Sequence, residues 1–280
     1  MTFLAGETAA VSTGFVAQSD DVYVDGGSDT ISVTGVSGGG FEALDTTDLV
    51  AVTINDTDDT TSLSLAGPAN VNEGSVTSAY TVSVKDAADA LVDTTGALTV
   101  TLGYSGVASD GSDFTGVADV TIGAGDSQAT FTITTLTDGV VEGAESFTVS
   151  LTGVSSGGSE FEKLVIDGTA DEVTTSIADA DSAVLTIDDV SVDEDAGTAT
   201  FSVTLDKATA AGFTVDYGFT DGTATGGVDY DDTAGTLTFA GTAGEVQTFS
   251  VTINDDVIAE GSEAFTVDLT SSDALVDDSD

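Results

Sequence analysis

The sequence lacks several residue types that most binding and catalytic sites use. It has no cysteine, no histidine, no tryptophan and no arginine. Without cysteine and histidine the chain can form no disulfide, and it has neither a thiol nucleophile, nor the imidazole base of a serine-protease-type triad, nor the usual zinc ligands. Most familiar catalytic chemistry is therefore excluded, and we expect that the protein is not an enzyme.

Positive charge is nearly absent as well. The chain has 50 aspartate and glutamate residues against three lysines, Lys85, Lys163 and Lys207, which gives a formal net charge of −47. A surface this acidic repels phosphate backbones and anionic lipids, so we expect no nucleic-acid partner and no binding to membrane surfaces. The charge partners that remain are cations.

Long hydrophobic runs are missing too. No apolar segment approaches the roughly 20 residues of a membrane span, which argues against direct membrane insertion. The first residues, Met1 to Glu7, lack the basic region and apolar stretch of a signal peptide. We therefore expect either secretion without an N-terminal signal or a start that is not the natural N-terminus. Yet 40% of the residues are hydrophobic, so the chain should bury cores.

The apolar residues of the sequence recur with a period of two. Apolar residues recur at every second position, as in Phe201, Val203 and Leu205, with Gly, Asp and Ser clusters between such segments. The same alternation occurs at Phe131 and Ile133, at Phe147, Val149 and Leu151, at Phe249, Val251 and Ile253, and at Phe265, Val267 and Leu269. Alternation indicates half-buried strands, and short, closely spaced strands predict an all-β protein built of antiparallel β-sandwiches.

The sequence also contains an internal repeat. Residues 138–151 align with residues 256–269, and more loosely with residues 21–33, at a period of about 120 residues. Three further pairs of anchors recur in the same order: Glu73 and Glu194, Asp113 and Asp229, and Asp56 and Asp179.

This repeat predicts three units. Residues 60–181 form a complete unit, residues 1–59 the C-terminal part of another, and residues 182–280 a unit that lacks its last strand. A sandwich without its last strand exposes an unpaired edge and part of its core. Two explanations stay open: the chain is a piece of a longer array of repeats, or identical chains complete one another by strand addition in a head-to-tail polymer.

Several repeated motifs resemble those of Calx-beta domains. They are Val-Asp-Glu194, Gly-Gly-Val-Asp229-Tyr, Gly-Thr-Leu-Thr-Phe239, and the segment from Ile253 through Glu263. The resemblance is closest in residues 182–273 and weaker in the middle unit, where a polar insertion intervenes. It implies tandem immunoglobulin-like sandwiches of the Calx-beta type, as in bacterial extracellular arrays of the adhesin type. In that family, carboxylates from loops at one end of the sandwich bind Ca²⁺.

The resemblance also implies three sets of candidate Ca²⁺ ligands. In the first unit the matching positions are Asp20, Asp21, Asp25, Asp56 and Asp58. In the middle unit they are Glu73, Asp113, Asp138, Glu142, Glu145, Asp179 and Asp181. In the last unit they are Glu194, Asp229, Asp255, Asp256, Glu260 and Glu263. The aspartates that should follow the final strand of the last unit are missing.

Elementary electrostatics supports a cation at such sites. Two carboxylates about 4 Å apart repel each other by about 1 kcal/mol in water and by about 4 kcal/mol at an effective dielectric constant of about 20. Ca²⁺ suits the task because it takes about six to eight oxygen ligands with loose geometry. The alternative is a surface that is acidic everywhere, as in proteins adapted to high salt.

The acids at the end of each repeat suggest a role for the ion. The boundaries between the predicted units carry two pairs of acids, Asp56 with Asp58 and Asp179 with Asp181. Ca²⁺ bound there would couple neighbouring units. We therefore predict a calcium-rigidified structural or adhesive segment of a large secreted, cell-surface or filament-forming protein. Its expected partners are neighbouring repeats of the same chain or identical chains. Two alternatives stay open, a Ca²⁺-sensing regulatory module of a membrane transporter and a non-catalytic module of an extracellular enzyme.

Overall fold

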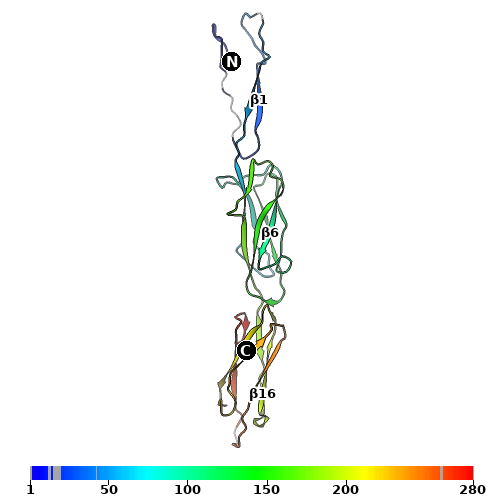
Figure 1. Ribbon diagram of the computed structural model, residues 1–280, viewed down its shortest axis with the longest axis vertical. Coiled ribbons are helices and arrows are strands. Elements are labelled where there is room, and N and C mark those ends of the chain that lie inside the picture. The colour runs from blue at the N-terminus through cyan, green and yellow to red at the C-terminus, as the bar shows by residue number, and fades with distance from the viewer. Residues whose placement is uncertain (1, 12–13, 15–19, 42, 259–260, 280) are drawn as a thin grey trace.

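The computed structural model of the protein describes residues 2–11, 14, 20–41, 43–258 and 261–279. Its parts follow one another along one long axis (Figure 1). Within the described residues, every regular element is a β-strand except one short 3-10 turn, η1 (Glu194–Ala196). The predicted all-β architecture is therefore confirmed. No helix in the described part of the chain is long and apolar enough to cross a membrane.

The middle part is a sandwich of two sheets. The first sheet has the order β13 (Lys163–Ile166), β3 (Thr60–Ala66), β5 (Tyr80–Lys85) and β9 (Gln128–Phe131). The second has the order β4 (Asn70–Asn72), β14 (Glu172–Ala178), β12 (Glu145–Ser156), β6 (Leu98–Gly106) and β8 (Asp119–Ile122). Two short strands, β7 (Phe114–Thr115) and β10 (Thr134–Thr135), pair with each other in the loops.

The alternating apolar residues of these two sheets share one core. In β12, Phe147, Val149 and Leu151 are buried, whereas the residues between them are partly exposed. The ring of Phe147 stacks on that of Phe114, with the ring centroids 4.3 Å apart. Each such side chain stabilises the fold by about 1.5 to 3 kcal/mol. The inward positions are those that the period of two predicts.

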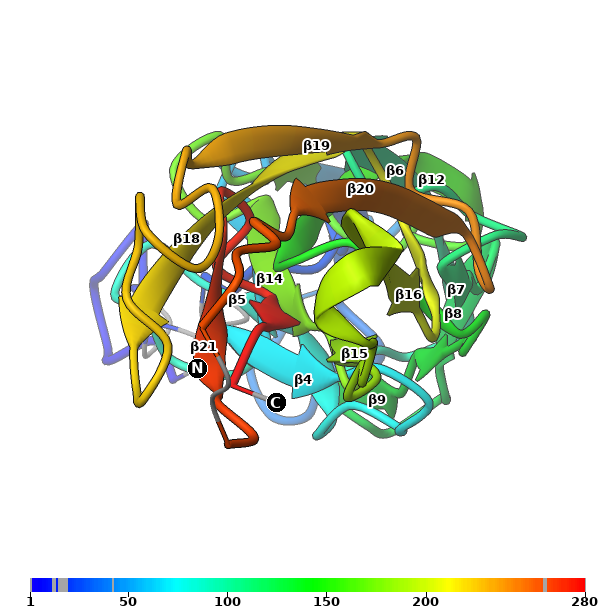
Figure 2. The same cartoon turned by 90° about the horizontal axis from the view of Figure 1, so that it is seen from below.

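The last part has two sheets as well. The first has the order β20 (Val246–Thr252), β16 (Thr198–Leu205), β15 (Ala183–Ile187) and β22 (Val276–Asp277). The second has the order β19 (Gly235–Phe239), β18 (Phe213–Asp221) and β21 (Phe265–Ser271). Figure 2, seen along the long axis, shows β18, β19 and β21 on one side of this part and β15, β16 and β20 on the other.

Burial in the last part differs between its two sheets. In β16 the alternating apolar residues are buried, as the sequence pattern predicts. In β21, however, Phe265, Val267 and Leu269 are only partly buried. The reason is that, among the residues described, no strand lies beyond β21 where β14 lies beyond β12. The core of this part is therefore open along one edge.

The first part contributes one hairpin to the described structure. Its strands β1 (Gly27–Ser32) and β2 (Leu49–Ile54) are antiparallel, with Gly27 opposite Ile54. All of β1 and most of β2 are exposed to solvent. A two-stranded hairpin alone is marginally stable in water, so its placement depends on contacts with the middle part.

Direct contacts join the three parts. At the second junction, β11 (Val140–Val141) pairs in parallel with β17 (Ala208–Thr209), and Val141 is buried in the core of the last part. At the first junction, the ring of Tyr23 stacks on that of Phe161, with centroids 5.7 Å apart. Phe161 belongs to the polar insertion between β12 and β14, so this insertion forms part of the first junction.

Candidate metal centre

Acidic side chains gather at the end of the middle part that adjoins the last part. They come from the loop after β4, the loop before β7, the segment between β10 and β12, and the segment after β14. Together they surround a cavity of about 20 Å³, which has room for one water molecule or one ion. The lining residues are Glu73, Ser112, Asp113, Leu136, Asp138, Glu142, Gly143, Glu145, Ile177 and Asp179.

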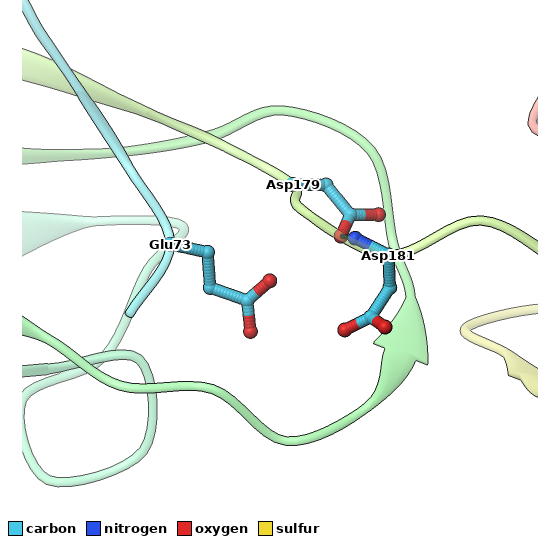
Figure 3. A group of neighbouring side chains, drawn as sticks. All are labelled: Glu73, Asp179 and Asp181. Carbon is cyan, nitrogen blue, oxygen red and sulfur yellow. Dashed lines mark hydrogen bonds between the residues drawn. The ribbon is translucent and has the colours of Figure 1, made fainter. Parts of the chain in front are cut away.

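Six of the seven acids predicted for the middle unit form two compact groups. In each group, one carboxylate oxygen from each of three residues lies within 4.8 Å of the other two. Figure 3 shows the first group, in which Glu73 reaches from the loop after β4 toward the segment after β14. The first group is Glu73, Asp179 and Asp181, and the second is Asp113, Glu142 and Glu145.

Backbone N–H groups fix two of these carboxylates in place. One oxygen of Glu73 accepts a hydrogen bond from the N–H of Asp138 at 3.2 Å. One oxygen of Asp179 accepts from the N–H of Glu142 at 2.8 Å and from the N–H of Gly143 at 3.1 Å. Gly143 has a φ of +81°, a left-handed conformation that glycine adopts without strain. The turn after β11 is therefore shaped to hold Asp179.

The pKa values of the clustered acids shift in opposite directions, because burial and hydrogen bonding act on them differently. Burial and then the charges of Asp138 and Glu145 raise the pKa of Glu142. Burial and then the charge of Asp113 raise the pKa of Glu145. Burial also opposes ionisation of Asp179, but its hydrogen bonds from backbone N–H groups outweigh burial and lower its pKa. The cluster thus contains two carboxylates whose ionised forms a bound cation would stabilise.

One lysine already neutralises part of this charge. The Nζ atom of Lys207 lies 2.8 Å from a carboxylate oxygen of Asp181. Lys207 precedes β17 in the last part, so this ion pair crosses the second junction. In the part of the chain that the structure describes, the one other ion pair joins Lys85 and Asp89, within a turn. Most carboxylates of the cluster therefore have no cationic side chain to balance them.

The donor set fits Ca²⁺ better than other common metals. Its side-chain ligands are carboxylates, which Ca²⁺ prefers, and they stand on loops that can supply about six to eight oxygens. Mg²⁺ demands a tighter octahedron, and softer metals prefer nitrogen or sulfur ligands that this chain lacks. The two groups of three acids are the residues that would hold the ion, and its chemistry there would be charge neutralisation and cross-linking of loops.

The last part repeats the scaffold of this site. The N–H of Asp256 donates a hydrogen bond to the carboxylate of Glu194 at 3.3 Å. This bond is equivalent to the one that the N–H of Asp138 donates to Glu73 in the middle part. The loops that carry the first predicted ligands are therefore arranged alike in the two repeats.

The predicted acids of the last part nevertheless form no compact group like those of the middle part. They surround an open cleft of about 960 Å³ rather than a small cavity. Within the described residues of this part, no three acids bring their oxygens within 4.8 Å of one another. Three of the predicted acids line the cleft: Glu194, Asp229 and Glu263. Asp255 and Asp256 do not line it. Glu260 lies outside the described residues.

The first junction holds two of the five acids predicted for the first unit. The N–H of Asp25 donates a hydrogen bond to the carboxylate of Asp56 at 3.1 Å. This bond is equivalent to the one made by the turn after β11 in the middle part. Asp20 and Asp21 instead accept hydrogen bonds from a nearby hydroxyl and a nearby N–H group, and Asp58 is exposed.

Two acids that the sequence analysis missed join this first junction. Both belong to the polar insertion, which has no counterpart in the other repeats. A hydrogen bond from the N–H of Asp59 favours ionised Glu162, but burial and the adjacent Asp56 outweigh it and raise the pKa of Glu162. The N–H of Asp25 lowers the pKa of Asp56. One oxygen each of Glu160 and Glu162 is buried and has no hydrogen-bond partner.

Comparison with protein families gives two matches. Residues 56–181 and residues 176–278 each match the Calx-beta domain. Residues 1–57 match the LapA domain. No enzyme domain is among these matches. No curated protein matches the chain.

Several solved structures resemble the chain at low sequence identity. The CBD12 structure from CALX1.2 is 22% identical, with 75% of this chain and 79% of that chain covered and a TM-score of 0.34. The calcium binding domain CBD12 of CALX1.1 is 23% identical, with 73% and 77% covered and a TM-score of 0.33. Domains 4–9 of the surface layer protein SbsC are 16% identical, with 83% and 33% covered and a TM-score of 0.23.

Proposed function

Because this chain belongs to the Calx-beta family, we propose that it is a calcium-rigidified structural segment of a large adhesin-like protein outside the cell. Two Calx-beta matches in tandem follow a LapA match, a combination typical of secreted and surface adhesins. In this role the segment is a spacer that holds other parts of the protein away from the cell. Ca²⁺ sets how stiff that spacer is.

The observation that carries this proposal is the place of the acidic cluster. Asp179 and Asp181 follow β14, the last strand of the middle part, and β15 of the last part begins at Ala183. An ion held by Asp179, Asp181 and Glu73 would tie this short linker to the loop after β4. Few backbone torsions would then be left to vary between the two sandwiches, so the junction would stiffen.

The energetics of such a site suit an extracellular setting. Without a cation the cluster is self-repulsive, because one lysine faces many carboxylates. Extracellular Ca²⁺ modules typically bind with dissociation constants of about 10⁻⁴ to 10⁻³ M. At an ion concentration about 100 times the dissociation constant, binding stabilises the folded state by about 2.7 kcal/mol.

Calorimetric titration with Ca²⁺ tests the proposal. We expect binding by the unaltered chain, and loss of the tightest site in the double variant Glu142→Gln with Asp179→Asn. The matched control is Asp119→Asn with Glu172→Gln, which removes the same charge from exposed strand positions outside the cavity. If both double variants bind Ca²⁺ alike, or if added NaCl reproduces the heat, the acids act only as a screened surface and the proposal fails.

A further inference from the structure

One short segment belongs both to the acidic cluster and to the core of the last part. Asp138 and Glu142 line the cavity of the cluster. Between them lies β11, which pairs with β17, and the carbonyl of Val141 accepts a hydrogen bond from the N–H of Ala210 at 2.9 Å. Val141 is 2% exposed and packs in the core of the last part. Residues 138–142 thus combine two candidate ion ligands with one core side chain of the neighbouring sandwich.

The segment before β17 is attached to the linker between the two sandwiches as well. Lys207 pairs with Asp181 at 2.8 Å. The carboxylate of Asp206 accepts a hydrogen bond from the N–H of Val184 at 2.6 Å, and the N–H of Asp206 donates to the carbonyl of Val184 at 3.1 Å. Residues 206–210 therefore contact both the linker and β11. The two connections between the cluster and the last part meet on one stretch of chain, between β16 and β18.

The first junction repeats this arrangement with a different partner. The internal repeat aligns residues 21–25 with residues 138–142. Between the acids of this first segment, Val22 and Tyr23 pack against the core of the middle part. Backbone hydrogen bonds join the segment to the polar insertion between β12 and β14. At both junctions, therefore, side chains between two acids pack into the sandwich that follows.

Ion binding and core packing require the same ordering of residues 138–142. Docking of Val141 fixes backbone torsions in this segment, which costs conformational entropy. A cation held by Asp138 and Glu142 would fix the same torsions and would offset the repulsion between their carboxylates. Once one of these events has ordered the segment, the other loses less entropy, so the two favour each other.

We propose that Ca²⁺ bound at the acidic cluster of the middle part stabilises the fold of the last part through residues 138–142. Coupling of this kind is reciprocal, so docking of Val141 strengthens Ca²⁺ binding by the same factor, typically about fivefold or more. The coupling rests on the proposed function, because it requires an ion at the cluster. In the spacer, the resistance of one sandwich to unfolding would then depend on the ion held by the sandwich before it.

The variants for the test remove ion ligands that lie away from the junction. Asp113 lies on the loop before β7, and Glu145 is the first residue of β12; in the described structure neither strand pairs with the last part. Asp113→Asn with Glu145→Gln therefore weakens the ion site and leaves residues 138–142, the linker and the acids of the last part unaltered. The matched control is Asp119→Asn with Glu172→Gln, at exposed strand positions outside the cavity.

Hydrogen exchange of the β16 and β20 amides measures the coupling, in Ca²⁺ and in EDTA at matched ionic strength. Amides of core strands exchange through unfolding of their sandwich, so their rates report its stability. In the unaltered chain and in the control we expect exchange about fivefold slower in Ca²⁺. In D113N/E145Q we expect equal rates in the two conditions. Protection by Ca²⁺ that persists in this variant would come from the acids of the last part itself and would overturn the coupling.

The reciprocal effect has a measurement of its own. Calorimetric titration should give a Ca²⁺ dissociation constant about fivefold higher for Val141→Ala than for the unaltered chain. Val140→Ala, in the same strand but partly exposed, is the control and should leave the constant unchanged. Equal constants for the two variants would overturn the coupling. The exchange experiment does not depend on these variants, so it decides the question even if V141A weakens the fold of the last part.

The two measurements together separate this inference from the proposed function. Calorimetric binding of Ca²⁺ with no change in the exchange of β16 and β20 would overturn the coupling alone, and the calcium-binding spacer would stand. A titration that detects no Ca²⁺ binding would overturn the proposed function and the coupling with it.

Discussion

Glu142 and Asp179 are neighbours in the acidic cluster, yet their pKa values shift in opposite directions. Backbone N–H groups, including that of Gly143, stabilise ionised Asp179 despite its partial burial. Burial, and then the like charges around it, raise the pKa of Glu142. A bound cation would offset the repulsion at Glu142 and would further stabilise ionised Asp179. At the residue scale, Glu142 is therefore the position whose charge should harm the ion-free protein and help the Ca²⁺ form.

We predict that Glu142→Gln changes the sign of its effect with Ca²⁺. In EDTA at pH 7 the variant should unfold at a higher temperature than the unaltered chain, because it removes repulsion. In saturating Ca²⁺ it should unfold at a lower temperature, with the dissociation constant raised about tenfold, or about 1.4 kcal/mol. Thermal melts and calorimetry measure the two effects. A variant that is destabilised in both conditions would contradict this prediction.

The pH dependence of the same variant follows from linkage. Since folding raises the pKa of Glu142, the native state binds more protons than the unfolded state between the two pKa values. The stability that this group contributes is present below its unfolded pKa and is lost as the pH rises through its folded pKa. In EDTA, the advantage of Glu142→Gln should thus shrink from pH 7 to pH 4. An advantage that grows on acidification, in melts of both proteins, would refute the assigned shift.

Lys207 should compete with Ca²⁺ for the junction. Its ion pair with Asp181 is partly exposed, and such pairs contribute about 0.2 to 1 kcal/mol. We therefore predict that Lys207→Gln lowers the Ca²⁺ dissociation constant by about two- to fivefold in calorimetric titrations. Lys85→Gln, which breaks the pair with Asp89 in a turn, is the matched control and should leave the constant unchanged. Weaker Ca²⁺ binding by the Lys207 variant would contradict this role.

At the scale of elements, the second junction is a packed contact as well as a linker. The short strand β11 pairs with β17 across the boundary, and Val141 is buried in the core of the last part at 2% exposure. The middle sandwich thus supplies one core residue to its neighbour. This contact orients the two sandwiches before any ion binds, and a Ca²⁺ ion next to it would then act on parts that already touch.

Truncating Val141 should weaken the last part more than the middle one. We predict that Val141→Ala destabilises the last part by about 1 to 3 kcal/mol, because it removes buried methyl groups and leaves a cavity. Val140→Ala, the partly exposed neighbour in the same strand, is the control and should have a small effect. Hydrogen exchange of the β16 and β20 amides measures the change. Equal protection in the two variants would mean that Val141 does not support this core.

Elements repeated in the sequence were the ones that the sequence could predict. The period of two identified the inward residues of β12 and β16, and the resemblance to Calx-beta domains pointed to the acids of the middle cluster. The part played by Glu160 and Glu162 could not be foreseen, because their insertion is unique and its position depends on tertiary contacts with the first part. The pairing of Lys207 with Asp181 was missed because it depends on tertiary contacts across the second junction.

The exposure of β21 shows a different limit of the sequence pattern. Its alternation of Phe265, Val267 and Leu269 is as regular as that of β12, yet these side chains are only partly buried. Alternation reports which face of a strand is apolar, whereas burial also requires a neighbouring strand and an opposing sheet. Which strands are neighbours is a property of the whole fold.

At the scale of the whole molecule, the parts form a rod whose two ends differ. One end holds the β1–β2 hairpin, whose strand β1 is exposed throughout, and the other end holds the last part (Figure 1). Between them, acids stand at both junctions. A net charge of −47 keeps such rods soluble and apart when divalent ions are scarce. The stiffness of the junctions would then respond to Ca²⁺.

The most direct test of the central claim is the distribution of distances across the second junction. The distance between spin labels on Thr130→Cys in β9 and Thr248→Cys in β20 measures it. Both positions are exposed, and the unaltered chain has no cysteine. Pulsed electron spin resonance should show one narrow distance distribution in Ca²⁺ and a broad one in EDTA at matched ionic strength. Glu142→Gln with Asp179→Asn should keep it broad in both. A distance distribution of equal width in Ca²⁺ and in EDTA would contradict a calcium-rigidified junction.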